Sequence, residues 1–187
     1  MSERKISVLG YALLGLLSSR PSSGYDLRKT FALTPMRTFS DSPGAIYPAL
    51  QRLEESGLIR GKVQDGSGLR RRKIYRLTAD GAVALKKWVG KPVTSEEVIG
   101  GMDELLLRFA FMDSVIERLA VIEFLRTLEQ ELKSYVPTLR EYLQSEGSRM
   151  QMSGRLALEN GIRGYETQLR WVRDALTTYE SEEHGGS

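Results

Sequence analysis

Residues 42–60 read Ser-Pro-Gly-Ala-Ile-Tyr-Pro-Ala-Leu-Gln-Arg-Leu-Glu-Glu-Ser-Gly-Leu-Ile-Arg. Ser42 is a residue type that caps helix N-termini, and the proline after it suits the first helical position. Ile46, Leu50 and Leu53 recur at spacings of four and three, which predicts one apolar stripe along a helix. The stretch therefore predicts a short amphipathic helix with one buried face.

The other face of this helix is polar, cationic and aromatic. Tyr47, Gln51 and Arg52 fall away from the apolar stripe. Gly57 tolerates the left-handed conformation that ends helices, and Leu58 begins an extended segment. This order is typical of a recognition helix followed by a wing. Many amphipathic helices only pack, so the helix alone leaves DNA reading and plain packing open, and Tyr47 can equally pack on the preceding helix.

Two extended segments follow, at 58–63 and 73–78. The turn expected between them is Asp-Gly-Ser-Gly at 65–68, and a run of four cations at 70–73 comes directly after it. The pattern predicts a β-hairpin with a cationic tip and return strand. In isolation such a hairpin is commonly a solvated charged surface, whereas beside a helix-turn-helix it indicates a wing that contacts phosphate or the minor groove.

Two further helices are expected before the recognition helix. Residues 6–19 are apolar on most sides and include small residues that would let another helix approach, and residues 24–33 form an amphipathic segment. The order helix, helix, helix, strand, strand predicts a winged helix-turn-helix over residues 1–92, in which a helix over 82–89 precedes the end of the domain.

Several motifs in this half resemble the PadR family of bacterial transcriptional regulators. They are Gly24-Tyr25, the run Gly-Ala-Ile-Tyr-Pro-Ala-Leu-Gln-Arg-Leu-Glu at 44–54, Gly-Leu-Ile at 57–59, and Arg-Lys-Ile-Tyr-Arg-Leu-Thr-Ala-Asp-Gly at 72–81. Two positions depart mildly from the family pattern, with Ile46 in place of Leu and Ile74 in place of Tyr. The strong motifs cover residues 6–90, and the remainder matches only as a helical region of suitable length. The resemblance implies a dimeric DNA-binding regulator, often a repressor, that is frequently released by a small aromatic or hydrophobic effector.

The residues expected to contact DNA lie at the recognition helix, on the helix before it and in the wing. We expect base-edge or phosphate contacts from the recognition helix and phosphate contacts from the wing. They are Arg28, Lys29, Ser42, Gly44, Tyr47, Gln51, Arg52, Lys62, Arg70, Arg71, Arg72 and Lys73.

Charge divides the chain into a basic and an acidic half. Residues 1–92 hold 17 Lys and Arg against 7 Asp and Glu, and residues 93–187 hold the remaining 10 against 17, so that the formal net charge of the whole chain is only +3. A basic half suits a polyanion and an acidic half does not, which indicates two separate tasks.

Long heptad patterns dominate the acidic half. A short apolar helix is expected over 96–111, a long helix is expected to begin at Asp113-Ser114 and to be kinked or broken at Pro137, and a final helix should run over 150–179. Two such helices joined by a short turn form a hairpin that buries too little alone, so residues 93–187 are predicted to dimerise. The expected dimerisation residues are Leu119, Ile122, Leu125, Leu158, Ile162, Tyr165, Leu169, Val172 and Leu176.

Composition excludes most catalytic and metal chemistry. The chain has no Cys, and its one His, His184, falls in a polar tail that we expect to be disordered from about residue 181. No enzyme activity, metal or cofactor is therefore expected. No apolar run has the roughly 20 residues that cross a membrane, so we expect a cytoplasmic protein without membrane contact.

The sequence as a whole predicts a mainly α protein, with a winged helix-turn-helix followed by a long-helix hairpin. Its predicted partners are double-stranded DNA, a second copy of itself and a small hydrophobic or aromatic effector. The predicted function is sequence-specific transcriptional regulation on a roughly palindromic operator. The family resemblance implies that this regulation is repression. The alternative is a winged-helix adaptor that binds proteins and no specific DNA.

Overall fold

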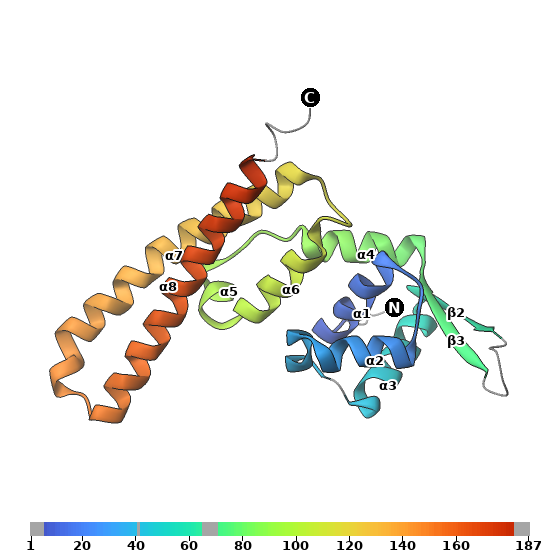
Figure 1. Ribbon diagram of the computed structural model, residues 1–187, viewed down its shortest axis with the longest axis horizontal. Helices are drawn as coiled ribbons and strands as arrows, with labels where there is room; N and C mark the ends of the chain where they lie inside the picture. The colour runs from blue at the N-terminus through green and yellow to red at the C-terminus, as the bar shows by residue number, and fades with distance from the viewer. Residues whose placement is uncertain (1–5, 41, 65–70, 182–187) are drawn as a thin grey trace. The chain divides into compact units, whose positions relative to one another are not determined.

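The computed structural model describes residues 6–40, 42–64 and 71–181 (Figure 1). They are mostly helical, with one small antiparallel sheet, as the sequence predicts. The chain forms two compact units. The wing unit comprises the residues up to Lys91 together with Leu106–Ile116, and the hairpin unit comprises Pro92–Leu105 together with the residues from Glu117 onward. The predicted division at residue 92 did not include the return of Leu106–Ile116 to the wing unit.

The wing unit holds the first eight elements of the chain. In order they are α1 (Val8–Ser19), β1 (Ser22–Ser23), α2 (Gly24–Leu33), the 3-10 turn η1 (Pro35–Thr38), α3 (Pro43–Glu55), β2 (Ile59–Gln64), β3 (Arg72–Leu77) and α4 (Ala79–Val89). Side-chain caps begin most of these helices. Ser42 Oγ, for example, accepts the N–H of Gly44 at 3.2 Å at the start of α3.

The predicted apolar stripe of α3 is confirmed. Ile46, Leu50 and Leu53 are all buried, together with Ala49 between them. The expected close approach to α1 also occurs, because a Cβ on Gly15 would overlap the ring of Phe111. Because its apolar residues are buried, α3 packs through its apolar side and leaves its polar side exposed to solvent.

The sheet contains a strand that the sequence analysis missed. Its order is β1-β3-β2, so the two residues of β1 pair with Tyr75 and Ile74 of β3. Two serines carry no strand pattern, and only the tertiary pairing makes them extended. β2 and β3 form the predicted hairpin in the register Ile59 opposite Leu77 to Gln64 opposite Arg72, while the predicted turn at 65–68 lies outside the described residues.

A buried cation closes the end of α4 within the wing unit. Arg108 is fully buried and donates from Nη2 to the carbonyl oxygens of Val89, at 3.4 Å, and of Lys91. A cation at a helix C-terminus is favoured by the helix dipole, so Arg108 fixes the segment where α4 ends.

The hairpin unit differs from its prediction at several helix boundaries. Its elements are α5 (Ser95–Gly100), α6 (Met102–Met112, shared with the wing unit), α7 (Arg118–Glu146), the 3-10 turn η2 (Gly147–Arg149) and α8 (Met152–Ser181). The single helix expected over 96–111 is two helices, because α5 ends at Gly100-Gly101. Residues 182–187, where the disordered tail was expected to continue, lie outside the described residues, and Ser181 is still helical.

The expected start of α7 was wrong, and the break that Pro137 could have caused is absent. The helix begins at Arg118 and not at Asp113, because the N–H groups of Val115 and Ile116 both bond the carbonyl of Met112 and so complete the preceding helix. The helix also continues without a break through Pro137. Pro137 is exposed, so water can bond the carbonyl that loses its N–H partner there.

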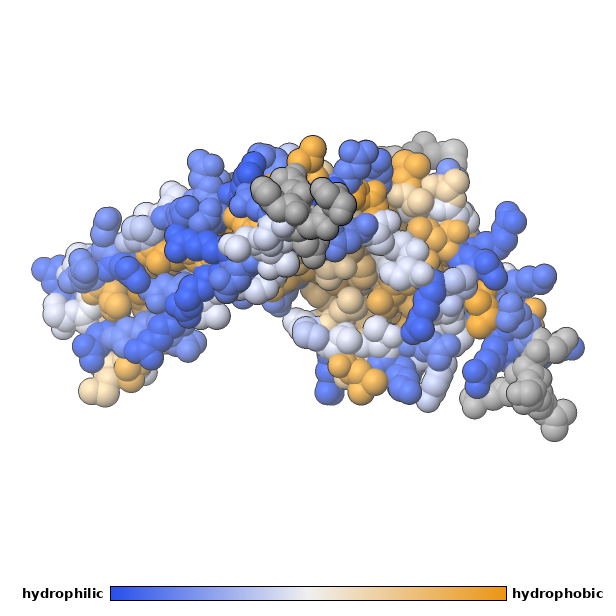
Figure 2. All heavy atoms as spheres, turned by 45° about the horizontal axis from the view of Figure 1, so that its top comes forward, coloured by the Kyte–Doolittle hydropathy of each residue, from blue (hydrophilic) through white to orange (hydrophobic). Residues whose placement is uncertain are grey.

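The heptad residues pack α7 and α8 together within one chain. Ile122, Leu125, Ile162, Val172 and Leu176 are buried. Figure 2 shows hydrophilic residues over much of the hairpin face in view, with apolar residues in the line between the two helices.

The other four predicted dimerisation residues have more surface. Leu158, Tyr165 and Leu169 are partly buried, and Leu119 is 68% exposed. The hairpin itself therefore fills most of the seam, and the dimer contact of this set stays a prediction.

Candidate nucleic-acid interface

The exposed face of α3 presents the side chains that the sequence assigned to it. Gln51 and Arg52 are exposed, as are Ser42 and Gly44 at the start of the helix. The side-chain amide of Gln51 donates to Glu55 Oε1 at 2.9 Å, one helical turn away. The Gln51 side chain is therefore oriented along the helix by its hydrogen bond to Glu55.

Tyr47 packs on the preceding helix, which is one of the two roles that the sequence left open, and its contact with DNA stays a prediction. Its ring is 45% exposed, yet Cε1 lies 2.6 Å from where a Cβ on Gly24 would stand. The absence of a side chain at Gly24 thus lets the tyrosine pack on the start of α2 while its outer edge reaches solvent.

A hollow of about 400 Å³ adjoins this tyrosine within the wing unit. Three tyrosines and three cations line it, with Ser23 and Gly24: Tyr25, Tyr47, Tyr75, Arg71, Arg72 and Lys73. Burial raises the pKa of Tyr75, so its hydroxyl stays protonated at neutral pH. The hollow therefore offers hydroxyl and cationic donors, which are the groups that bind phosphate oxygens.

The two predicted cations of α2 have different surroundings. Arg28 is partly buried, and its guanidinium carbon lies 5.8 Å from the centre of the Tyr25 ring, a cation–π arrangement. Lys29 is exposed. Arg28 is thus held by an aromatic neighbour, while Lys29 projects from the helix.

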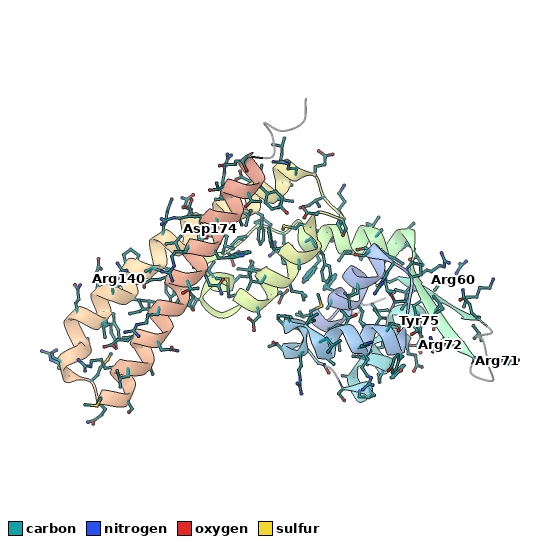
Figure 3. The ribbon with its side chains drawn as sticks, in the orientation of Figure 1. Arg60, Arg71, Arg72, Tyr75, Arg140 and Asp174 are labelled. Atoms are coloured by element: carbon teal, nitrogen blue, oxygen red, sulfur yellow. The ribbon has the colours of Figure 1, made fainter. Side chains whose placement is uncertain are left out.

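Strand alternation divides the wing cations between two faces. Successive residues of a strand point to opposite sides, and the register fixes which residues share a side. Lys62 and Arg72 share one face with Arg60 and Arg76, and all four are exposed. Figure 3 labels Arg60 and Arg72 on the two strands of the hairpin. Among the residues that the structure describes, no acid pairs with these four cations.

Lys73 belongs to the opposite face. It shares that face with Gly61 and Tyr75, and its Nζ forms an ion pair with Glu54 Oε2 at 2.6 Å. Lys73 therefore pairs with a carboxylate of the same chain, and its expected contact with DNA stays a prediction. Arg71 precedes β3 and is exposed, and Arg70 lies outside the described residues.

Sequence reasoning missed three residues of this surface. Arg60 and Arg76 lie outside the cationic run at 70–73, and the alternation of strand residues is the signal that finds them. Glu54 has no such signal, since nothing in the sequence shows that a carboxylate on a helix meets a lysine nineteen positions later.

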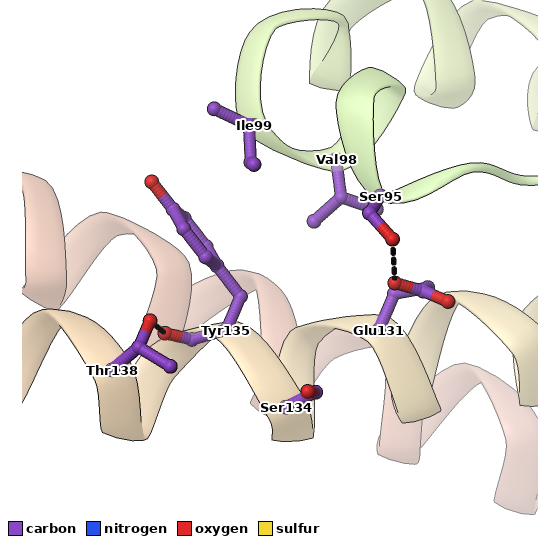
Figure 4. Close-up of a pocket in the computed structure, with 7 residues that line it drawn as sticks. All are labelled: Ser95, Val98, Ile99, Glu131, Ser134, Tyr135 and Thr138. Atoms are coloured by element: carbon purple, nitrogen blue, oxygen red, sulfur yellow. Dashed lines mark hydrogen bonds between the residues drawn. The ribbon is translucent and has the colours of Figure 1, made fainter.

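A second candidate site is a pocket within the hairpin unit. It has a volume of about 120 Å³ and is lined by Ser95, Val98, Ile99, Glu131, Ser134, Tyr135 and Thr138 (Figure 4). The Ser95 hydroxyl donates to Glu131 Oε2 at 2.6 Å, and the Tyr135 ring meets the Tyr165 ring edge-on with centroids 5.1 Å apart. The pocket thus combines one aromatic wall with several hydroxyl groups.

The residues that the structure describes contain neither a membrane-spanning helix nor a cluster of metal-binding side chains. No helix there is long and apolar enough to cross a bilayer. Within the same residues, no three side chains of the metal-binding types gather around a common point.

Comparison with known proteins gives a consistent family assignment. The model of the transcriptional regulator PadR-like family matches residues 13–87, and a second family model, described as virulence activator alpha C-terminal, matches residues 103–180. The chain is 25% identical over 183 residues to the negative transcriptional regulator PadR of Bacillus subtilis, covering 94% of this chain and 99% of that protein. It is 34% identical over 79 residues to the transcriptional regulator YqjI of Escherichia coli, covering 42% of this chain and 36% of that protein.

A solved structure resembles the chain along nearly its whole length. The crystal structure of Bacillus subtilis PadR in complex with operator DNA aligns with a TM-score of 0.46 at 23% identity, covering 94% of this chain and 99% of that one. These relatives are regulators and not enzymes. Residues 13–87, which hold the winged helix-turn-helix motifs, therefore match the PadR-like family of transcriptional regulators, and residues 103–180 match a different family model.

Proposed function

We propose that this regulator is a repressor that binds a roughly palindromic operator as a homodimer, with α3 in the major groove and the wing on the DNA backbone. One observation carries the proposal: the four-cation face of the wing, formed by Arg60, Lys62, Arg72 and Arg76, accompanies an α3 whose polar side is open. A helix of this kind fits the major groove, and cations beside it neutralise phosphates.

The cations of the four-cation face repel one another, and a bound polyanion would reduce this repulsion. Arg60 and Arg76 stand directly opposite each other in the β2–β3 register. Like charges in this position destabilise a strand pair, and no acid among the described residues offsets them. An adaptor that binds a neutral or basic protein surface would leave this repulsion in place, so the arrangement favours DNA over the adaptor alternative.

The proposed dimer uses the apolar side chains that the hairpin leaves exposed. They are Leu119 and Tyr142 on α7 and Met152 and Leu156 on α8. The partly buried members of the heptad set, Leu158, Tyr165 and Leu169, would complete the contact. A two-fold dimer would place two recognition helices on two related half-sites, about one helical turn or a multiple of it apart.

Repression is proposed from the relative that covers nearly the whole chain. Bacillus subtilis PadR, which matches over 94% of this chain, is a negative regulator. A repressor needs a signal that releases it, and the pocket between α5 and α7 is where we place the effector. Its volume of about 120 Å³ is close to the roughly 150 Å³ of a cavity that holds one benzene ring.

The chemistry of the pocket narrows the effector class. Tyr135 supplies an aromatic wall, whereas Glu131 supplies a carboxylate that would repel an anion. We therefore expect a small neutral phenol to raise the melting temperature of the chain and benzoate to leave it unchanged. Glu131→Gln should abolish this discrimination, which differential scanning calorimetry would show.

A selection experiment tests the DNA-binding proposal. The full chain would be presented with a pool of random 40-base-pair duplexes, and the bound fraction would be sequenced and then measured by mobility shift at two salt concentrations. The expected result is one enriched sequence with two-fold symmetry and binding that weakens steeply with salt. An unenriched pool, or affinity that ignores salt, would contradict the proposal and favour the adaptor.

A further inference from the structure

A single carboxylate joins the recognition helix to the wing. Glu54, in the last turns of α3, accepts the backbone N–H of Gly61 in β2 through Oε1 at 3.0 Å. Its other oxygen, Oε2, accepts from Lys73 Nζ in β3 at 2.6 Å. The Glu54 side chain therefore connects α3 to both strands of the wing, through Gly61 of β2 and Lys73 of β3.

The neighbouring residues are shaped for this contact. A Cβ built on Gly61 would overlap Lys73 Cε and would lie 2.8 Å from Glu54 Oε1, so a side chain at this position would displace the end of Lys73 from its place beside the carboxylate. The ammonium of Lys73 also lies 5.3 Å from the centre of the Tyr75 ring. Gly61 and Lys73 thus bind the carboxylate of Glu54, and Tyr75 lies beside the lysine.

The Glu54 pair contributes little to the stability of the fold. The side chains of Lys73 and Glu54 are 41% and 30% exposed, and ion pairs with this exposure add little because water screens them. A contact that engages three elements at once but stabilises the fold only slightly is better explained by the geometry it imposes.

We propose that Glu54 is a positioning residue for DNA recognition, which fixes the wing against α3 and so sets where the four-cation face meets the backbone. This inference rests on the proposed function. It assigns Lys73 to the chain's own carboxylate and removes it from the phosphate contacts. The wing and α3 then read DNA as one rigid surface.

The sign of one substitution separates this role from a passive one. A carboxylate that merely stood near DNA would repel the phosphates, so Glu54→Gln would tighten binding. A positioning carboxylate predicts weaker binding by Glu54→Gln. Its loss frees the wing from α3, so part of the binding free energy must then be spent on ordering the wing.

A double-mutant cycle tests the proposal on the duplex enriched by the selection described above. We expect Glu54→Gln and Lys73→Met each to weaken binding about fivefold, and the double variant to bind no more weakly than either single one. Gly61→Ala should weaken binding similarly in the natural chain, because it displaces Lys73, and should have no further effect when Lys73 is already Met. Melting temperatures of all variants should stay within a few degrees of the natural chain.

Two controls fix the interpretation. Asp80→Asn makes the same charge change at another exposed acid of the wing unit, on α4, and it should leave binding to the enriched duplex unchanged. Arg72→Met should lower the slope of log affinity against log salt by about 0.9, whereas Lys73→Met should leave the slope unchanged. Tighter binding by Glu54→Gln, additive effects in the cycle, or a slope loss for Lys73→Met equal to that for Arg72→Met would each overturn the proposal.

Hydrogen exchange separates failure of this inference from failure of the proposed function. In the full chain without DNA, Glu54→Ala should speed exchange at the amide of Gly61, because it removes the oxygen that accepts this N–H. Should the selection enrich no duplex, that exchange would still report whether Glu54 holds the wing, and an unchanged rate would refute the contact directly.

Discussion

The wing and the α7–α8 hairpin arrange their charges in opposite ways. The hairpin matches charges across its two helices, with Arg126 to Glu180 at 2.8 Å, Arg140 to Glu166 at 2.5 Å and Arg173 to Glu129 at 2.8 Å. The four-cation face of the wing has no such partners among the residues described. Charges matched inside a unit are neutralised by that unit, whereas charges left on one face are available to a partner, so the contrast separates the scaffold from the proposed binding surface.

The largest effect should come from a charge placed inside the hairpin seam. Val172 is fully buried, so Val172→Asp would bury an uncompensated carboxylate and lower the free energy of unfolding by about 3–5 kcal/mol. Urea unfolding followed by circular dichroism measures this.

Leu119→Asp is the matched control for the seam. Its side chain is 68% exposed, so the substitution should change the unfolding free energy by less than about 0.5 kcal/mol. The same variant should weaken the dimer in sedimentation experiments. A Val172→Asp chain as stable as the natural one would contradict the buried seam, and a Leu119→Asp dimer as tight as the natural one would move the interface elsewhere.

The next effect concerns the unmatched cations. Replacing Arg60, Lys62, Arg72 and Arg76 by Gln should weaken binding to all duplexes about 10²- to 10³-fold near physiological salt and flatten the salt slope by about 3–4. The comparison set is Arg126, Arg140, Arg155 and Arg173 to Gln, which removes the same charge from the hairpin. Mobility shifts in which the two sets lose affinity equally would erase the contrast between wing and hairpin.

A smaller effect is expected where α3 reads sequence. Gln51→Ala should reduce the preference for the selected duplex over random DNA by about 1–3 kcal/mol, because a glutamine amide can bond a base edge at two points. Competition binding measures the ratio. Equal loss on both duplexes would leave Gln51 with a positioning role only.

The smallest effect is the acid sensitivity of the hairpin. Hydrogen bonds from Lys133 and then Arg173 hold the pKa of Glu129 below its usual value, so the carboxylate stabilises the folded state above the unfolded pKa. That contribution is lost as pH falls through the lowered pKa of the folded state. Glu129→Gln should therefore flatten the fall in unfolding free energy between about pH 5 and pH 3, by about 1 kcal/mol or less. A curve as steep as that of the natural chain would show that the pair does not matter.

Much of the wing unit followed from the sequence because its signals are local. The cap at Ser42, the stripe of Ile46, Leu50 and Leu53, and the glycine at 57 each act within one turn of helix, and the structure confirms the helix they predict. Gly57 indeed has a positive φ of 74°. The short strand β1 could not be foreseen, since its pairing with β3 depends on the folded position of both.

The candidate interface was predicted less completely, for a physical reason. A run of adjacent cations on a strand divides between two faces, so Lys73 points to Glu54 while Arg72 joins Arg60 and Arg76. The heptads of α7 and α8 likewise predict an apolar seam without saying whether the partner is the same chain or a copy. Burial of Leu125 and Val172 answers that question for the inner part of the seam.

The strand order β1-β3-β2 has a further consequence for how this surface is engineered. β2 lies at the edge of the described sheet, so its outer backbone groups are free to recruit a strand from another molecule. Arg60 and Lys62 stand on that edge, beside an exposed Val63. Charged side chains on an edge strand prevent sheets from adding to one another, so the cations that are proposed to bind DNA also protect the chain from aggregation. Variants made to abolish binding should therefore replace these residues with acidic side chains and not with valine or isoleucine, which would turn a silent regulator into a fibre-forming one.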